Sequence, residues 1–106
     1  MSEAFAFSEP RAGLLCVRGD LRHAHARAFA ELLLTRLNAL AVLHVELFQV
    51  TAADLSTIQT MIVAARDARQ QGKELRFTGY GLALAELVDQ LAVAQELGGP
   101  LAVVWE

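Results

Sequence analysis

The chain has 106 residues, of which 55% are hydrophobic, and a formal net charge of −3. This length predicts a single domain over residues 1–106, hydrophobic enough to build a core without disulfide or metal staples. The basic residues form no cluster, which argues against nucleic-acid binding by phosphate neutralisation. No apolar run reaches the roughly 18 residues of a membrane span, and the first residues lack the basic and apolar regions of a signal peptide. We therefore expect a soluble, cytoplasmic protein without direct membrane insertion.

The N-terminal part of the chain predicts two strands close enough to form a hairpin. Residues 4–7 alternate as an edge strand, and residues 13–18 form a second strand of consecutive apolar residues. Pro10 and Gly13 bracket the turn between them. Cys16, the single cysteine, cannot form an internal disulfide, and its apolar neighbours predict a small buried hydrophobe.

Two helices and a buried strand follow. Residues 22–37 carry apolar side chains at helical spacing, and Asp20 is placed to act as a cap or turn residue before them. Residues 42–47 are apolar on both faces, which is typical of a buried parallel strand. A second amphipathic helix spans residues 56–71, and Gly72 is placed to end it in a left-handed conformation.

The C-terminal part predicts a strand over residues 73–78, a helix over residues 82–96 and a final apolar strand over residues 101–105. Strands that alternate with helices indicate an α/β domain with parallel pairs joined by right-handed crossovers. We expect a small mixed sheet of four to five strands with three or four helices packed against it.

The turn between the central strand and the second helix concentrates polar residues: Thr51, Asp54, Ser56 and Thr57. Helix starts expose unpaired N–H groups and a positive dipole end, so they attract oxygen acceptors. Ser56 and Gln59 have the spacing of a capping box, which gives Ser56 a structural role. The alternative is that this turn is a surface read by a partner protein.

The sequence predicts no catalytic, metal or cofactor site. His23 and His25 lie two apart near a helix start and are expected to be solvated, while His44 is expected to be a satisfied sheet histidine. Glu46 and Asp54 have the chemistry of an acid/base pair. The favoured role for Glu46 is to accept a backbone or hydroxyl hydrogen bond near the turn and to fix its shape.

Tyr80 lies in the turn Gly79–Gly81 after a strand. Ligands of open α/β sheets bind at the carboxyl ends of strands, so Tyr80 either borders a binding surface or packs into the turn.

Several features of the chain occur together in one known family: an apolar strand 14–17 before Gly19-Asp20-Leu21, an acid in the central strand at Glu46, and a turn acid at Asp54. With the order of strands and helices, this set resembles the STAS domain of sulfate transporters and anti-sigma factor antagonists over residues 14–97. In many members of that family the residue after the turn Asp is a Ser or Thr that a partner kinase phosphorylates.

This chain has Leu55 at that place, so it lacks the usual phosphoacceptor. Ser56 and Thr57 carry hydroxyls next to it and are the alternative phosphoacceptors. One residue along a helix turns a side chain by about 100°, however, away from a kinase fitted to the usual site. We therefore expect docking that does not depend on phosphorylation.

The resemblance implies a bacterial, non-enzymatic signalling module that regulates transcription or chemotaxis. Its implied partner is an anti-sigma or histidine-kinase-like ATPase protein, or another signalling component. Two alternatives remain at this stage: an accessory subunit of an ABC lipid or solute transporter, and a small-ligand or nucleotide-binding module. The residues expected to border the partner are Asp54, Leu55, Ser56, Thr57 and Gln59.

Overall fold

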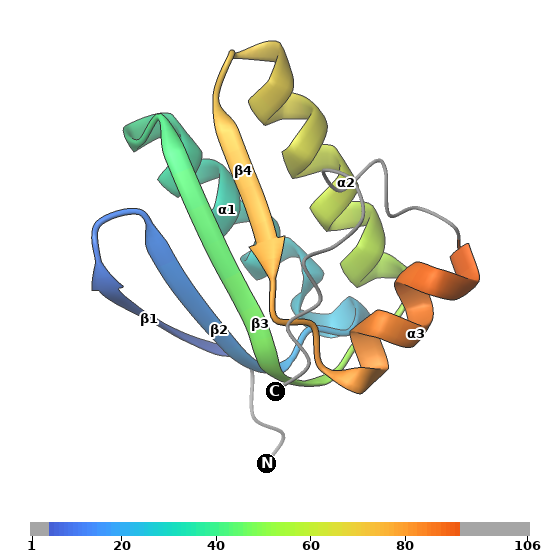
Figure 1. Ribbon diagram of the computed structural model, residues 1–106. Coiled ribbons are helices and arrows are strands. Elements are labelled where there is room, and N and C mark those ends of the chain that lie inside the picture. The colour runs from blue at the N-terminus through green and yellow to red at the C-terminus, as the bar shows by residue number, and fades with distance from the viewer. Residues whose placement is uncertain (1–4, 92–106) are drawn as a thin grey trace.

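The computed structural model describes residues 5–91, and all structural statements below concern that part of the chain. Its strands form one mixed sheet in the order β1-β2-β3-β4, in which β1 is antiparallel to β2 while β2, β3 and β4 run parallel (Figure 1). The elements in chain order are β1 (Ala6–Arg11), β2 (Leu14–Asp20), the 3₁₀ helix η1 (His23–His25), α1 (Ala26–Ala39), β3 (Val42–Ala52), α2 (Leu55–Gln70), β4 (Glu74–Thr78) and α3 (Leu82–Leu91).

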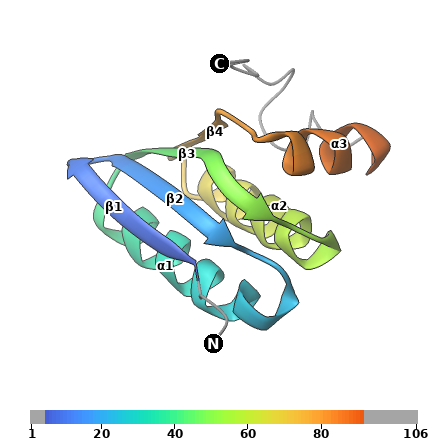
Figure 2. The same cartoon turned by 90° about the horizontal axis from the view of Figure 1, so that it is seen from below.

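The two long helices make the crossover connections of the parallel strands. Helix α1 joins β2 to β3, and helix α2 joins β3 to β4. Figure 2 shows α1 and α2 on the same face of the sheet, with α3 set apart from them beside the β4 end of the sheet. The fold is therefore a single small α/β domain with one helix-covered face, as the alternation of strands and helices predicts.

The core lies between the sheet and the helices that cover it. Alternate β3 residues Leu43, Val45 and Leu47 are fully buried there, because successive side chains of a strand point to opposite faces. Helix α1 meets them with three fully buried residues at helical spacing, namely Phe29, Leu33 and Leu37. Helices α2 and α3 complete the same cluster with Ile58, Met61, Ala64, Ala68, Leu84 and Val88.

Two strands differ in extent from the prediction. Strand β1 includes Pro10, and the turn falls at residues 12–13. Proline is tolerated there because β1 is an edge strand whose register with β2 shifts between Ser8 and Arg11. Strand β3 continues to Ala52, five residues beyond the predicted end, because it keeps pairing with β2 after a register shift.

The helices also differ at their ends. Helix α1 begins at Ala26, since the 3₁₀ turn η1 takes up the preceding residues. Helix α2 begins one residue earlier than predicted, at Leu55. The end of the third predicted helix, residues 92–96, and the predicted strand 101–105 lie outside the described residues.

Gly72 ends the α2 segment with φ of +69°, as the sequence predicts. A Cβ atom built there meets nothing within 4 Å, so the backbone conformation alone disfavours other residues. We expect Gly72→Ala to lower the free energy of unfolding by about 1 to 2 kcal/mol, because L-residues are strained in this region. Urea denaturation measures it, and Gly72→Asn is the control because asparagine tolerates positive φ. Equal losses for the two variants would contradict this explanation.

Candidate functional site at the start of helix α2

Asp54 is the N-cap of helix α2. Its backbone is extended, and its carboxylate oxygen Oδ1 accepts a hydrogen bond from the Thr57 backbone N–H at 3.4 Å. In return, the Asp54 N–H donates to Thr57 Oγ1 at 3.1 Å. Asp54 and Thr57 therefore form the capping box, and the predicted box of Ser56 and Gln59 is wrong, because the helix begins at Leu55 and places Thr57 at the N3 position.

The segment after β2 is hydrogen-bonded to the same helix start. The backbone N–H of His23 donates to Asp54 Oδ2 at 2.9 Å, and His23 Nδ1 lies 3.1 Å from Ser56 Oγ. The Thr57 hydroxyl donates to the Leu21 carbonyl oxygen at 2.6 Å. Two loops more than 30 residues apart in the chain are thus joined, and the start of α2 has one defined geometry.

The five residues predicted to border a partner differ in accessibility. Leu55 is 52% exposed and Gln59 is exposed, while Asp54 and Ser56 are half-buried. We call these four residues the α2 corner. Thr57 is fully buried, so its hydroxyl is part of the domain's internal hydrogen bonding and reaches neither a partner nor a kinase in this conformation.

Asp20 acts as a turn residue beside this corner. Its carboxylate accepts hydrogen bonds from the Arg22 backbone N–H and side chain, and the ion pair between Asp20 Oδ2 and Arg22 Nη2 measures 2.8 Å. The hydrogen bond from the Arg22 side chain, supported by that from its backbone N–H, lowers the pKa of Asp20 to about 2.

A carboxyl whose pKa is lowered on folding stabilises the fold above its unfolded pKa of about 4. We therefore expect the contribution of Asp20 to be complete above pH 4 and to be lost as the pH falls toward 2. Asp20→Asn removes the titration, so its stability should change less between pH 4 and pH 2 than that of the wild type. Thermal unfolding over this range measures the difference, and parallel pH curves would contradict the assignment.

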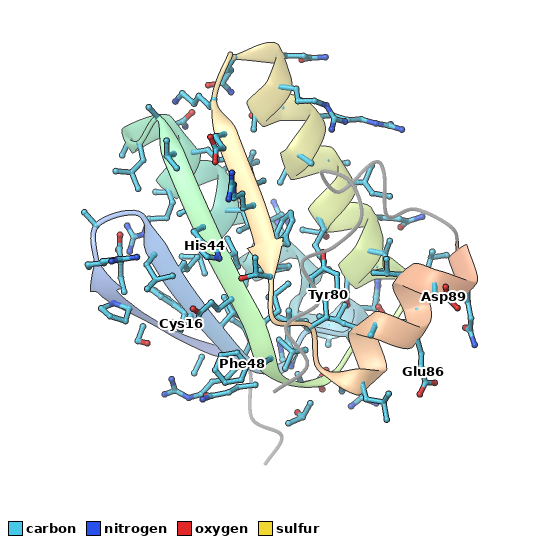
Figure 3. All side chains as sticks on the ribbon, in the orientation of Figure 1. Cys16, His44, Phe48, Tyr80, Glu86 and Asp89 are labelled. Carbon is cyan, nitrogen blue, oxygen red and sulfur yellow. The ribbon has the colours of Figure 1, made fainter. Side chains whose placement is uncertain are left out.

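The sheet face opposite α1 and α2 carries a second set of polar residues. Figure 3 shows Cys16 on β2 and His44 on the neighbouring strand β3. The Cys16 thiol donates to Glu46 Oε1 at 3.6 Å, and His44 Nε2 lies 2.6 Å from Thr78 Oγ1. His44 is therefore a satisfied sheet histidine, as predicted.

Cys16 and Glu46 do not occupy the predicted positions. Cys16 is partly exposed, because alternation along β2 turns it away from the helices. Glu46 lies in the middle of β3, away from the turn, since β3 continues six residues beyond it. Burial and the neighbouring Glu46 raise the pKa of the Cys16 thiol, so it stays protonated and is a weak nucleophile.

Tyr80 is a buried turn residue rather than the border of a surface. Its side chain is 3% exposed and belongs to the core cluster, and burial raises its pKa. Phe48 is half-exposed, and its ring is packed against the turn so closely that a Cβ at Gly79 would lie 3.0 Å from Phe48 Cδ1. Figure 3 places both aromatic residues near the carboxyl ends of β3 and β4.

Within residues 5–91 no group of three or more His, Cys, Asp or Glu side chains is arranged to hold a metal ion. In the same part of the chain, no helix has both the length and the apolar character needed to cross a membrane.

The mixed four-stranded sheet with its two crossover helices forms one α/β domain, with the capped start of α2 at one edge of the sheet. A family model described as "Mlab, STAS domain" matches residues 6–102, and the chain belongs to this family. The sequence-based recognition of a STAS domain and of its fold is thereby confirmed. No curated protein matches the chain significantly.

Solved structures with the same fold include two regulators. The anti-sigma factor antagonist SpoIIAA, in its unphosphorylated form, has a TM-score of 0.63 at 12% identity, and the match covers 90% of this chain and 99% of SpoIIAA. The complex of the diguanylate cyclase SiaD with its activator SiaC from Pseudomonas aeruginosa gives a TM-score of 0.63 at 18% identity, covering 97% of this chain and 93% of the matched chain.

A third similar structure is an uncharacterized protein of the DUF3478 family from Shewanella loihica, described as having a SpoIIAA-like fold. It has a TM-score of 0.56 at 17% identity, and the match covers all of this chain and 92% of that one. At these identities the likeness concerns the fold alone.

Proposed function

We propose that this chain is a non-catalytic docking module of a signalling pathway that binds a protein partner through the α2 corner. The observation that carries the proposal is Leu55, an apolar residue that is 52% exposed in the first turn of α2, beside the half-buried polar residues Asp54 and Ser56. An apolar centre with a polar rim is the usual arrangement of a protein–protein interface.

The fixed geometry of the corner favours binding. Asp54 and Ser56 are within hydrogen-bonding distance of His23, and Thr57 donates a hydrogen bond to Leu21. The backbone on both sides of Leu55 is therefore held in place before a partner binds. A surface that is already ordered loses less conformational entropy when it binds. The corner therefore holds the backbone at Leu55 in one conformation.

Structural relatives support a regulatory partner. SpoIIAA is named an anti-sigma factor antagonist, and SiaC is named the activator of the diguanylate cyclase with which it was solved. By extension, we infer that the partner of this chain is an anti-sigma or histidine-kinase-like ATPase protein, or another signalling component.

Docking is proposed to be constitutive. SpoIIAA has been solved in a phosphorylated form, but this chain places Leu55, which has no hydroxyl, directly after the turn acid Asp54. Thr57 is buried, and the Ser56 hydroxyl is engaged by His23 at 3.1 Å. A phosphate found on Ser56 in cells, together with loss of partner binding, would overturn constitutive docking.

Affinity purification from the source cells, with the wild type and Leu55→Asp as parallel baits, tests the proposal. We expect a signalling protein that is retained by the wild type and absent with Leu55→Asp. Retention of a transporter ATPase would support the accessory-subunit alternative, and a co-purifying small molecule would support a ligand-binding module. A signalling protein retained equally by both baits would exclude the α2 corner as the contact.

A further inference from the structure

A groove with a volume of about 310 Å³ lies between α1 and α2 on their solvent side. Its lining residues come from the two helices and from η1, and they are His23, Ala26, Ala30, Leu34, Ser56, Gln59, Thr60, Val63 and Ala64. Val63 is 59% exposed and Leu34 is 37% exposed, so apolar surface remains open to solvent along the groove.

The chemistry of the lining is apolar along the groove and polar at one end. Ala26, Ala30 and Leu34 recur every fourth residue on α1 and form one row. At the polar end, His23 and Ser56 lie across the groove from one another and are joined by their 3.1 Å contact. None of the lining residues is an aspartate, glutamate, lysine or arginine.

The groove is continuous with the α2 corner, because Ser56 and Gln59 belong to both. We propose that an amphipathic helix of the partner protein lies in this groove while the partner contacts Leu55 at the corner. This assignment rests on the proposed function and specifies the part of the partner that is recognised.

The dimensions and the lining favour a helix as the occupant. The row from Ala26 to Leu34 covers eight helical steps, or about 12 Å, which matches about two turns of a helix lying alongside. The small side chains of Ala26 and Ala30, which are half-buried, let a third helix approach closely, and Ala64 forms the floor beneath them. Such a helix carries apolar residues at i, i+3 or i+4, and i+7.

The residues that line the groove determine which side chains the partner helix can bury there. An ionised side chain pressed against the apolar part of the groove would lose its hydration without gaining a partner. The buried face of the helix is therefore uncharged, and a hydrogen-bonding residue falls at the end that meets Ser56 and Gln59. A second copy of this chain is a poor occupant, because a two-fold interface centred here would set one concave groove against another.

Val63→Asp, compared with Val42→Asp, tests the assignment in the full chain. Val63 is 59% exposed in the groove, whereas Val42 is 51% exposed at the start of β3 and does not line it. Using the partner recovered with the wild-type bait, we expect Val63→Asp to weaken binding by about tenfold or more and Val42→Asp to leave it within about twofold. Circular dichroism checks that both variants fold.

A comparison of Val63→Asp with Leu55→Asp tests the helix in the groove separately from the contact at the α2 corner. Normal binding by Val63→Asp with loss of binding by Leu55→Asp would refute the helix in the groove and leave the α2 corner as the contact. Normal binding by both variants would refute both.

Photo-cross-linking identifies the occupant directly. A benzophenone amino acid in place of Val63 should react with a partner segment whose apolar residues recur at helical spacing, and this segment made as a synthetic peptide should bind the wild type but not Val63→Asp. Cross-links to a second copy, to an extended segment or to a small molecule would each overturn the assignment. So would the absence of any cross-link from a complex that has formed.

Discussion

We expect Leu55→Asp to weaken partner binding strongly while the domain stays folded. Leu55 is the first residue of α2, is 52% exposed and does not belong to the hydrophobic core cluster, so its replacement leaves the core residues in place. A carboxylate in the first turn of a helix also interacts favourably with the helix dipole, so stability should not fall. At the interface the same carboxylate would lose its hydration in place of an apolar anchor. We expect affinity to fall by at least roughly 30-fold, the effect of losing a hot spot of about 2 kcal/mol.

Val42→Asp is the matched control for Leu55→Asp. It places the same charge on an apolar residue of similar exposure, 51%, at the start of β3, whereas Leu55 follows the end of that strand. Isothermal titration calorimetry with the purified partner compares the two variants. Equal affinities for both variants and the wild type would remove Leu55 from the interface.

Thr57→Val should be the most destabilising change at the start of α2. Its hydroxyl donates to the Leu21 carbonyl oxygen at 2.6 Å and accepts from the Asp54 N–H at 3.1 Å, in a fully buried position. Valine has a similar shape, but it leaves these backbone groups without their partner. Because unsatisfied buried groups are costly, we expect the free energy of unfolding to fall by about 1 to 3 kcal/mol.

Ser56→Ala is the control for Thr57→Val, because it removes a hydroxyl one residue away whose contact with His23 is in an exposed position. We expect it to change stability by less than about 0.5 kcal/mol. Chemical denaturation of the two variants makes the comparison. Similar losses for both would show that the link from Thr57 to Leu21 does not hold the corner in place.

The periodicity of the sequence predicted much of the fold because burial follows simple repeats. Leu43, Val45 and Leu47 alternate into the core, and residues of α1 such as Phe29 and Leu33 recur at helical spacing. A run of consecutive apolar residues does not indicate which side chains of a strand face the core. The run around Cys16 gave no alternation, so the partial exposure of this residue on the sheet face opposite α1 and α2 was missed.

Local sequence patterns could not predict which residues cap α2 or which residues are in contact at the α2 corner. Ser56 and Gln59 have the residue types of the usual capping box, whereas Asp54 and Thr57, which form the box in the structure, do not, because the N3 residue is a threonine. The contact of His23 with Ser56 joins residues 33 apart. The predicted topology could have indicated this contact, because the loops that follow two neighbouring parallel strands lie at the same edge of the sheet.

Amide hydrogen exchange of the chain, free and bound to its purified partner, tests docking at the α2 corner most directly. The N–H groups of Leu55 and Ser56 lie in the first turn of α2, where helix geometry provides no intrahelical acceptor. They should exchange rapidly in the free protein and be strongly protected in the complex, while Val42 at the other end of β3 should be unchanged. Protection confined to residues of the sheet, with Leu55 and Ser56 still exchanging rapidly, would contradict docking at this corner.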